Sequence, residues 1–505
     1  MDIKDYNIMF KIYISIFMLG IILTSCSTYT SSINLNQEIE NPNQDKWLSE
    51  NIEFSDNSKI PQDWWTIFQD ENLNIVMNDF LKNNYDLKIA FLSLQSSQSL
   101  SIVNKSSVLP DLSFNLGDRI GQSNNKGTQF EDIGMPTIDT IPHPSIPDST
   151  IYAISGFDKL KVTSISEKHE LSLSSQWEID LWGKISSNNL SIDKNLEMQQ
   201  NEFDFFKFSI ISQAVKIYFN VVELNEQVNL ANSSVIANQD VFNIVKVRYN
   251  KGIGASLLDY RLAKSNLLIS QASLEQRKMI LDSYKRQLET LIGRYPTGNI
   301  LISTSLSKHL PTIPANMPSD IIKNRPDILS SYNKIESAEI DLYHANKLKY
   351  PSFNLTSSIG TSSGELSDIL NGDALVWGLG SNILLPIFQN GKLKENEKLA
   401  ASMYEKSKIE YYDKLLKAFS EIENKLALNQ MLDKQVLLLT QALDEAEKTY
   451  ELAKERYNKG LINLITVIDS QKRMLDIKSQ MILARKALIE NRVDLLICLG
   501  GNFSE

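Results

Sequence analysis

The chain has 505 residues and carries 51 Lys and Arg against 61 Asp and Glu, which gives a formal net charge of -10. A nucleic-acid binder shows a basic face, so this balance argues against nucleic acid as a partner. Two cysteines and four scattered histidines exclude a disulfide framework and a cysteine-based zinc site, and we expect neither a metal nor a cofactor.

The N-terminal segment has the features of a lipoprotein signal peptide. The apolar run 12–23 suits the hydrophobic part of a signal peptide but is too short to span a bilayer, which takes about 20 residues. It leads into a Leu-Thr-Ser-Cys sequence that looks like a lipobox, with Cys26 as the lipidated residue. We predict a signal peptide over 1–25 and a lipidated linker over 26–60, with Ser27 favouring sorting to the outer membrane. The alternative is an ordinary secretory signal with a fortuitous cysteine.

The remainder of the chain contains an internal repeat. Its landmarks recur at fixed offsets: Arg248-Tyr249-Asn250-Lys251-Gly252 returns 208 residues later as Arg456-Tyr457-Asn458-Lys459-Gly460, Gly183-Lys184 returns at the same offset as Gly391-Lys392, and Asp86 and Pro110 return 241 residues later as Asp327 and Pro351. The two offsets differ by 33 residues, which indicates an insertion in the first copy. The polar, proline-containing residues 121–150 supply it by lengthening one loop. Such self-similarity predicts that both copies share one structural unit.

Each copy is predicted to contain a helix, a β-hairpin and a long helical hairpin, in that order. The first structural repeat spans 61–300 and the second spans 301–505. The three elements cover about 72–107, 111–182 and 185–292 in the first copy, and about 327–349, 352–387 and 392–498 in the second.

The two β-hairpins show the period-two alternation of strands with one apolar face. The apolar positions are Leu112, Phe114, Leu116, Leu171, Leu173, Trp177, Ile179 and Leu181 in the first copy and Phe353, Leu355, Ile359, Trp377, Leu379, Ile383, Leu385 and Ile387 in the second. Segments of about ten alternating residues are typical of a transmembrane barrel, although a half-buried strand of a soluble sandwich has the same pattern. No other stretch resembles a transmembrane helix, so these strands would have to make any membrane crossing.

Two segments predict very long helices. Between Gly183 and Gly252, and again between Gly391 and Gly460, lie 68 residues without Gly or Pro. A helix of about 65 residues is about 98 Å long, whereas the hydrocarbon core of a bilayer is about 30 Å thick. Apolar residues step by 4 and 3 along both segments, as in helices packed side by side. We therefore predict antiparallel helical hairpins that project into an aqueous compartment.

Four strands per chain cannot close a membrane barrel alone. The smallest outer-membrane barrels have about eight strands, and open sheet edges do not survive in lipid. The strands must therefore be shared among several chains.

In combination, these features resemble the outer-membrane factor family of TolC-like channels, in particular its NodT/OprM-type lipoproteins. The resemblance runs from about Trp64 to Gly501. It is carried by Trp65-x-x-Phe68-x-Asp70, Asn84-x-Asp86-Leu87, Trp177-Glu178-Ile179-Asp180-Leu181-Trp182-Gly183, Asn324-Arg325-Pro326-Asp327-Ile328, Pro351-Ser352-Phe353, Leu385-Pro386-Ile387-Phe388 and Asn390-Gly391. It implies a mixed α/β membrane protein, a homotrimer with a shared 12-stranded β-barrel, four strands per chain, and a long periplasmic α-helical barrel.

The resemblance also implies a function. Such a protein is lipid-anchored in the cell outer membrane with a periplasmic extension, and it is the passive exit duct of a tripartite efflux system for drugs or other small amphiphiles. Its partners are a periplasmic adaptor (membrane fusion protein), an inner-membrane pump of the RND type and outer-membrane lipid. A type I protein-secretion duct and a lipid-anchored periplasmic coiled-coil scaffold stay open as alternatives. Because Gly-x-Ser-x-Gly, P-loop and complete dinucleotide-binding motifs are absent, we expect no catalytic residue and no enzyme.

The resemblance places two groups of site residues at the turns of the helical hairpins. The adaptor-contacting tips are Gly252, Leu257, Leu258, Gly460 and Leu464. The periplasmic gate is formed by Ile465, Asp469 and Lys472, with Asp259 as the weaker candidate from the first copy. Repeated around a threefold axis, Asp469 would make closure charge-dependent, whereas Lys472 lacks the bidentate fork that an arginine latch would use. The simpler interpretations are that the glycines only end helices and that Asp469 is a solvated surface residue.

Several other conspicuous residues are expected to serve packing. These are Trp64 and Trp65, the tyrosines Tyr249 and Tyr457 on the heptad seam, and Cys498 as a small buried apolar residue. The Arg325-Pro326-Asp327 sequence is interpreted as a helix start, with the acid in the first turn.

Overall fold

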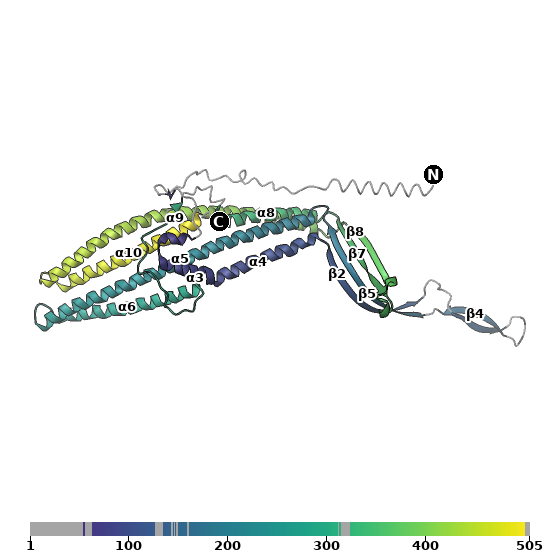
Figure 1. The fold of residues 1–505 in the computed structure, drawn as a ribbon, viewed down its shortest axis with the longest axis horizontal. Helices are drawn as coiled ribbons and strands as arrows, with labels where there is room; N and C mark the ends of the chain where they lie inside the picture. Colours follow the sequence, from purple (N-terminus) through teal and green to yellow (C-terminus); the bar gives the residue numbers. More distant parts are fainter. Residues whose placement is uncertain are drawn as a thin grey trace. The chain divides into compact units, whose positions relative to one another are not determined.

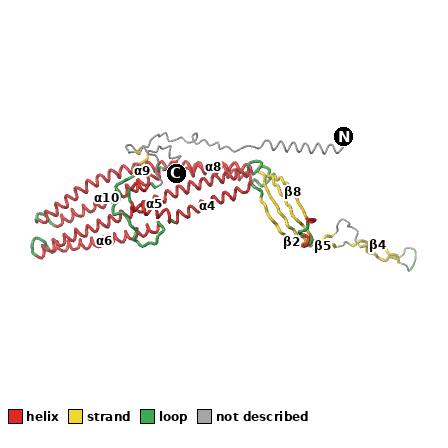
Figure 2. The backbone as a smooth tube through the Cα atoms, in the orientation of Figure 1, coloured by secondary structure: helices red, strands yellow, loops and turns green. Residues whose placement is uncertain are grey.

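The computed structural model describes residues 54–55, 63–126, 135–142, 145, 147, 150–158, 161–311, 313–314 and 324–499. The predicted signal peptide and the lipidation site at Cys26 lie outside these residues. The described residues of Val103–Asn188 and Tyr343–Asn396 form one compact unit, and the remaining described residues form a second. Figure 1 labels the helices and strands, and Figure 2 shows the strands and the helices in different colours.

The first unit is built on a four-stranded antiparallel sheet, as the sequence predicts. Its strands follow the order β2-β5-β7-β8 and are β2 (Asp111–Lys126), β5 (Lys161–Ile179), β7 (Ser352–Ser363) and β8 (Leu375–Leu384). The register brings the predicted apolar positions into line: Phe114 pairs with Leu173, Leu173 with Ile359, and Ile359 with Trp377. Because directly opposite residues point to the same face, one apolar face runs across all four strands.

The two faces of this sheet differ in polarity. On the apolar face, the exposed fraction reaches 67% at Phe114 and 75% at Trp377. On the other face, the Ser113 and Ser174 hydroxyls lie 2.8 Å apart, and the Asn115 amide donates a 2.9 Å hydrogen bond to the Ser174 hydroxyl. Apolar side chains that stay exposed to this extent mark a surface that an apolar environment or another chain covers.

The insertion of the first copy contains strands rather than a plain loop. Strand β3 (Met135–Pro142) lies within it and pairs antiparallel with β4 (Thr150–Asp158), which begins at the last residue of the insertion. Four prolines in the segment favour a loop, so this hairpin was not predicted from the sequence. Two of these, Pro136 and Pro142, lie at the second and the last position of β3, where a two-stranded ribbon tolerates residues without a backbone N–H.

The helix predicted over about 72–107 is in fact two helices, and this corrects the sequence analysis. After the 3-10 turn η1 (Trp64–Phe68), helix α3 (Glu71–Asn83) ends at Asn84 and helix α4 (Tyr85–Lys105) follows, with a short 3-10 turn η2 (Ser106–Val108) after it. The Asn84 side chain accepts a 2.8 Å hydrogen bond from the Leu87 N–H and donates another, also 2.8 Å, to the Leu291 carbonyl. Asn84 therefore caps α4 and fixes the break against the end of a distant helix.

The long helices agree with the two predicted glycine-bounded segments. Helices α5 (Lys184–Asn250) and α6 (Leu257–Leu291) form the first helical hairpin, and α9 (Lys392–Asn458) and α10 (Leu464–Cys498) form the second. Both α5 and α9 have 67 residues, which is about 100 Å of helix. Helix α8 (Pro326–Lys347) precedes β7. The short elements are β1 (Phe54–Ser55), which pairs with β6 (Ile313–Pro314), and the 3-10 turns η3 (Leu366–Asp368) and η4 (Gly372–Ala374).

None of the helices among the described residues is both long and apolar enough to cross a lipid bilayer.

The main core of the second unit surrounds the N-terminal end of α3. Trp64 and Trp65 are buried there, which confirms their packing role. The Tyr218 hydroxyl donates to the carboxylate of Asp70 at 2.9 Å, and the Ser303 hydroxyl donates to the same carboxylate at 2.7 Å. Burial raises the pKa of Tyr218, so its hydroxyl keeps the proton that it donates. This polar group joins α3, α5 and the segment after α6.

A second group of hydrogen bonds fixes the segment after α6. The buried Glu289 carboxylate accepts hydrogen bonds from the Gly298 N–H at 2.6 Å, the Asn299 N–H at 3.0 Å and the Thr297 hydroxyl at 2.9 Å. Burial acts to raise the pKa of Glu289, but these hydrogen bonds outweigh it and hold the pKa below its ordinary value of 4.5. The carboxylate is therefore ionised where it organises the loop.

The end of α10 lies beside the start of α8. The guanidinium of Arg325 forms two 2.9 Å hydrogen bonds to the carboxylate of Asp327 and a 3.3 Å bond to the carbonyl oxygen of Cys498. Cys498 is buried, as predicted. Arg325 therefore has a cross-linking role that a helix start alone does not explain.

Candidate functional site

The two helical hairpins turn with the same backbone motif. Gly252 ends α5 at φ 67° and Gly460 ends α9 at φ 76°, in the left-handed region where other residues are strained. The Ile253 N–H bonds the Arg248 carbonyl at 2.9 Å, and the Leu461 N–H bonds the Arg456 carbonyl at 3.0 Å. These are Schellman ends, so both glycines have the structural role of terminating a helix.

The second helix of each hairpin begins differently. Helix α6 starts with a capping box, in which the Asp259 N–H bonds the Ser256 hydroxyl and the Asp259 carboxylate accepts from the Ser256 N–H at 2.9 Å. Helix α10 starts with Asn463, whose side chain accepts from the Thr466 N–H at 3.0 Å. The carboxylate of Asp259 is therefore engaged in its own helix cap, which makes this residue a weak gate candidate.

The three gate residues predicted on α10 lie on one stripe of the helix. Ile465 is 54% exposed, and Asp469 and Lys472 are exposed at spacings of four and three residues. Neither Asp469 nor Lys472 forms a hydrogen bond or an ion pair through its side chain with another of the residues described by the structure. The stripe is thus a surface of one aliphatic, one acidic and one basic side chain, available to another molecule.

The predicted tip contacts divide into exposed and buried residues. Leu257 and Leu258 are 53% and 74% exposed, whereas Leu464 is only 2% exposed and packs in a cluster with Val467 and Tyr457. Leu464 was expected among the adaptor contacts, and in the folded chain its side chain is not accessible for that. Leu464 lies three residues before Val467 and seven before Gln471, so it continues the buried face of α10 to the first residue of the helix.

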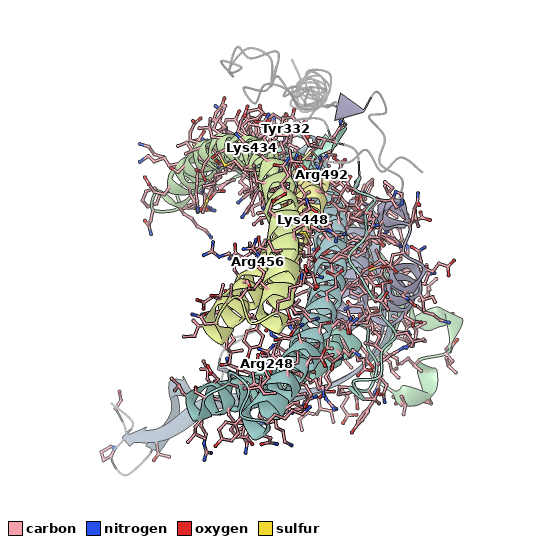
Figure 3. The ribbon with its side chains drawn as sticks, turned by 90° about the vertical axis from the view of Figure 1, so that its left-hand side faces the viewer. Arg248, Tyr332, Lys434, Lys448, Arg456 and Arg492 are labelled. Carbon is pink, nitrogen blue, oxygen red and sulfur yellow. The ribbon has the colours of Figure 1, made fainter. Side chains whose placement is uncertain are left out.

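A contact between the two hairpins was missed by the sequence analysis. The Arg248 guanidinium of α5 donates a 2.8 Å hydrogen bond to the carbonyl oxygen of Asn458, the last residue of α9, and lies 4.6 Å from the centre of the Tyr457 ring. Figure 3 labels Arg248 and its repeat counterpart Arg456. Tyr457 is 6% exposed and therefore packs as predicted, while Tyr249 is 39% exposed. The repeated Arg-Tyr sequence was a usable signal, but it identified the repeat and not the partner of the arginine.

No three His, Cys, Asp or Glu side chains gather into a metal-binding group within the described ranges. The site consists of helix caps, exposed aliphatic side chains and the charged stripe of α10. Such an arrangement can bind a partner or narrow an opening.

Comparison with known proteins finds a matching family and relatives of similar architecture. Residues 76–294 and 317–501 match the sequence model of the family described as "Outer membrane efflux protein". The chain is 26% identical to the solvent efflux pump outer membrane protein SrpC of Pseudomonas putida, with 86% of this chain and 87% of that protein covered. It also resembles the solved CmeC outer membrane channel of Campylobacter jejuni (25% identity, TM-score 0.74, 90% of each chain covered) and the open state of the MtrE outer membrane channel of Neisseria gonorrhoeae (21% identity, TM-score 0.76, 91% and 95% covered).

Proposed function

The chain belongs to the outer membrane efflux protein family, and from this membership we propose that it forms the outer-membrane exit duct of a tripartite efflux system. The duct carries drugs or other small amphiphiles passively from the periplasm to the outside. One observation carries the proposal: a four-stranded sheet has an apolar and a polar face, and its edge strands are β2 and β8.

Several copies of the sheet form the wall of the duct. Unpaired strand edges in lipid leave backbone groups without hydrogen bonds, so β8 of one copy pairs with β2 of the next until the barrel closes. Three copies supply 12 strands, with the apolar face outward and the face of Ser113, Asn115 and Ser174 lining a wet lumen. This homotrimer is the assembly that the family resemblance implies.

The hairpin tips dock a periplasmic adaptor, and through it an inner-membrane pump of the RND type. Support comes from aliphatic side chains that are exposed beside polar helix caps: Ile253 is 63%, Leu258 is 74% and Leu461 is 69% exposed. Exposed apolar residues at a turn suit burial against a partner. SrpC, which is similar over most of its length, is named as part of a solvent efflux pump.

The stripe of Ile465, Asp469 and Lys472 narrows the periplasmic end. Several Asp469 carboxylates close together attract cations and repel one another. Closure of the tip and ion selectivity therefore both depend on this carboxylate. The repeat provides a matched control, because Arg261 is the exposed counterpart of Asp469 in the first copy. In planar bilayers, Asp469→Asn lowers the cation preference of the pore, whereas Arg261→Gln, which removes a positive charge from the equivalent position, does not lower it. An equal effect of both variants would contradict this gate.

Cys26 carries a lipid anchor, and the chain has no enzymatic activity of its own. Cys26→Ala with an ordinary signal-peptide cleavage site should reach the outer membrane less efficiently but conduct normally once inserted. Mass spectrometry of the mature N-terminus tests the lipid directly, and an unmodified cysteine there would refute the anchor.

The deletion strain provides the test of the exit duct. Loss of the protein should sensitise cells to several unrelated amphiphiles, and the wild-type gene should restore resistance. Purified protein should also give ion conductance in planar bilayers. A protein that restores no resistance and conducts no ions would instead fit a lipid-anchored scaffold.

A further inference from the structure

The loop that follows α6 forms one wall of a cavity in the second unit. The cavity has a volume of about 470 Å³, and helix α3 forms the opposite wall. Its lining includes Ile75 and Asp79 of α3 and Arg294, Tyr295, Asn299 and Leu301 of the loop. This volume is within the usual range of ligand pockets, so the cavity has room for a ligand of moderate size.

The loop wall of the cavity is fixed before any ligand arrives. The Glu289 carboxylate accepts three hydrogen bonds from the loop, and the Arg286 guanidinium donates a 2.9 Å hydrogen bond to the Pro296 carbonyl. The Arg294 guanidinium forms an ion pair with the Asp79 carboxylate and so joins the loop to α3. A wall held in this way needs little further ordering on binding, which favours affinity.

Large apolar side chains stay open beside this fixed wall. Tyr295 is 85% exposed, Leu301 is 78% exposed and Ile75 is 58% exposed. The Tyr295 hydroxyl forms no hydrogen bond with another of the residues that the structure describes. An aromatic ring and two aliphatic side chains gathered at one cavity mark a surface that another molecule covers.

The polar groups of the cavity favour a neutral ligand. The charges of Asp79 and Arg294 offset each other in their ion pair, and the Glu289 carboxylate is occupied by the loop. The Asn299 side chain is exposed, and its amide has no hydrogen bond with any residue in the described ranges. The cavity therefore offers amide donors and acceptors but no unpaired charge for an ion.

We propose that this cavity binds a neutral glycan of N-acetylated amino sugars, the chemistry of the cell-wall polymer of the periplasm. The inference rests on the proposed function, which places the long helical hairpins in that compartment. A pyranose ring has an apolar face of C–H groups and a rim of hydroxyl and amide groups. The Tyr295 ring packs on the face, while the Asn299 amide and the Arg294–Asp79 pair bind the rim.

This site is well separated from the hairpin tip. Helix α6 has 35 residues, so about 50 Å of helix lies between its first residue at the tip and its last residue beside the cavity. A glycan bound here leaves the exposed tip residues Leu257 and Leu258 free for a protein partner. The cavity thus anchors the duct in the cell wall without competing for the tip.

Two binding measurements on the purified full-length protein test the proposal. One is co-sedimentation with peptidoglycan sacculi, and the other is calorimetric titration with a tetramer of N-acetylglucosamine. The detergent must have no sugar head group, because such a group would compete for the cavity. The test variant is Tyr295→Ala, with Tyr295→Phe as its conservative partner. The control variant is Tyr284→Ala, which removes a 36% exposed tyrosine of α6 from outside the cavity.

The wild type should bind both the sacculi and the tetramer. Loss of the aromatic ring in Tyr295→Ala should weaken tetramer binding about tenfold. Tyr295→Phe keeps the ring and should retain most of the affinity, and Tyr284→Ala should bind like the wild type. Because Tyr295 is 85% exposed, Tyr295→Ala should melt like the wild type, so its loss of affinity is not a loss of fold. Equal affinity of wild type and Tyr295→Ala would overturn the site.

Two further outcomes identify a different ligand. Binding to sacculi without binding to the tetramer would indicate the peptide stems of the wall and would overturn the glycan site. Lipopolysaccharide also contains N-acylated amino sugars, but these carry phosphate groups. Tighter binding of lipopolysaccharide than of the neutral tetramer would overturn the inference that the cavity selects a neutral glycan.

Conductance in planar bilayers separates the glycan site from the duct. A wild-type protein that conducts ions but binds no tetramer overturns only the glycan site. A protein that binds the tetramer through Tyr295 but neither conducts ions nor restores resistance upholds the site and overturns the duct. Tyr295→Ala should conduct like the wild type, because the cavity is not part of the pore.

Discussion

Replacing Arg248 by alanine should loosen the closed state of the tip. The guanidinium makes a charged hydrogen bond to the carbonyl of Asn458 and covers the ring of Tyr457. A hydrogen bond to a charged group contributes about 1.5 kcal/mol at the low end, which is appropriate for this partly exposed site. The cation–π contact adds about 0.5 kcal/mol. The loss of about 2 kcal/mol per chain corresponds to about a 30-fold change in the equilibrium between joined and separated hairpins.

Single-channel recording in planar bilayers measures the effect. If the hairpins separate when the tip opens, Arg248→Ala spends a larger fraction of time in the conducting state than the wild type. Arg248→Lys keeps the charge near the helix end but loses the fork and most of the stacking, so an intermediate open fraction is expected. Because every copy carries the same contact, the effect multiplies with the number of chains.

Two controls separate the loss of this contact from a loss of positive charge at the tip and from a loss of overall stability. Lys251→Ala removes one positive charge from the same tip without touching the contact, so its open fraction should equal that of the wild type. Thermal unfolding of Arg248→Ala should stay close to that of the wild type, since the contact lies at the end of long helices. An unchanged open fraction in Arg248→Ala, measured on a fully assembled oligomer, would refute the idea that this contact closes the tip.

Three further changes test the fold that supports the site. Glu289→Gln should destabilise the protein by about 2 kcal/mol at pH 7, because a charged hydrogen-bond acceptor is lost. The folded-state pKa of Glu289 is lowered, so thermal melts should show the full loss of stability above pH 4.5. The stability difference between variant and wild type should vanish as the pH falls through the lowered pKa. Gly360→Ala should abolish the heat-resistant oligomer, since a Cβ there would clash with the Leu171 carbonyl of the neighbouring strand, whereas Gly117→Ala meets no atom within 4 Å and should be tolerated. Tyr218→Phe should lower stability by about 1–3 kcal/mol, because a buried carboxylate loses a hydroxyl donor; unchanged melting would contradict the role of this group.

The long helices could be predicted closely because their limits are set locally. Glycines 183, 252, 391 and 460 bracket segments without Gly or Pro, and the helices begin and end next to them. The two faces of the sheet were equally predictable, since alternation fixes which side chains of a strand share a face. Both features depend on residues close together in the sequence.

The features that the sequence analysis missed depend on residues far apart. The break at Asn84 is fixed by a bond to Leu291, 207 residues away, and the Arg248 contact joins residues 210 apart. The burial of Leu464 depends on a cluster that includes Val245 and Ala263 of the first hairpin, about 200 residues away. The boundaries of the signal peptide and of the two repeats, and the lipid on Cys26, stay predictions.

The difference between the two turns explains how duplicated hairpins can have different tips. Farther from the tip, their second helices bury equivalent positions: Ala263 and Leu274 on α6 correspond to Gln471 and Ile482 on α10, each 208 residues later, and all four are buried. In the first turn the correspondence fails. The second hairpin buries Leu464 and Val467, so its apolar seam extends to the tip.

The first hairpin places Ser256 and Asp259 at these two positions, and hydrogen bonds close its tip instead. A ring of such chains therefore presents two alternating kinds of tip, one held by apolar packing and one by a polar cap. A partner that docks around the whole ring must fit both kinds of tip. A partner surface with two alternating sets of contacts would fit them, whereas a uniform partner surface would not.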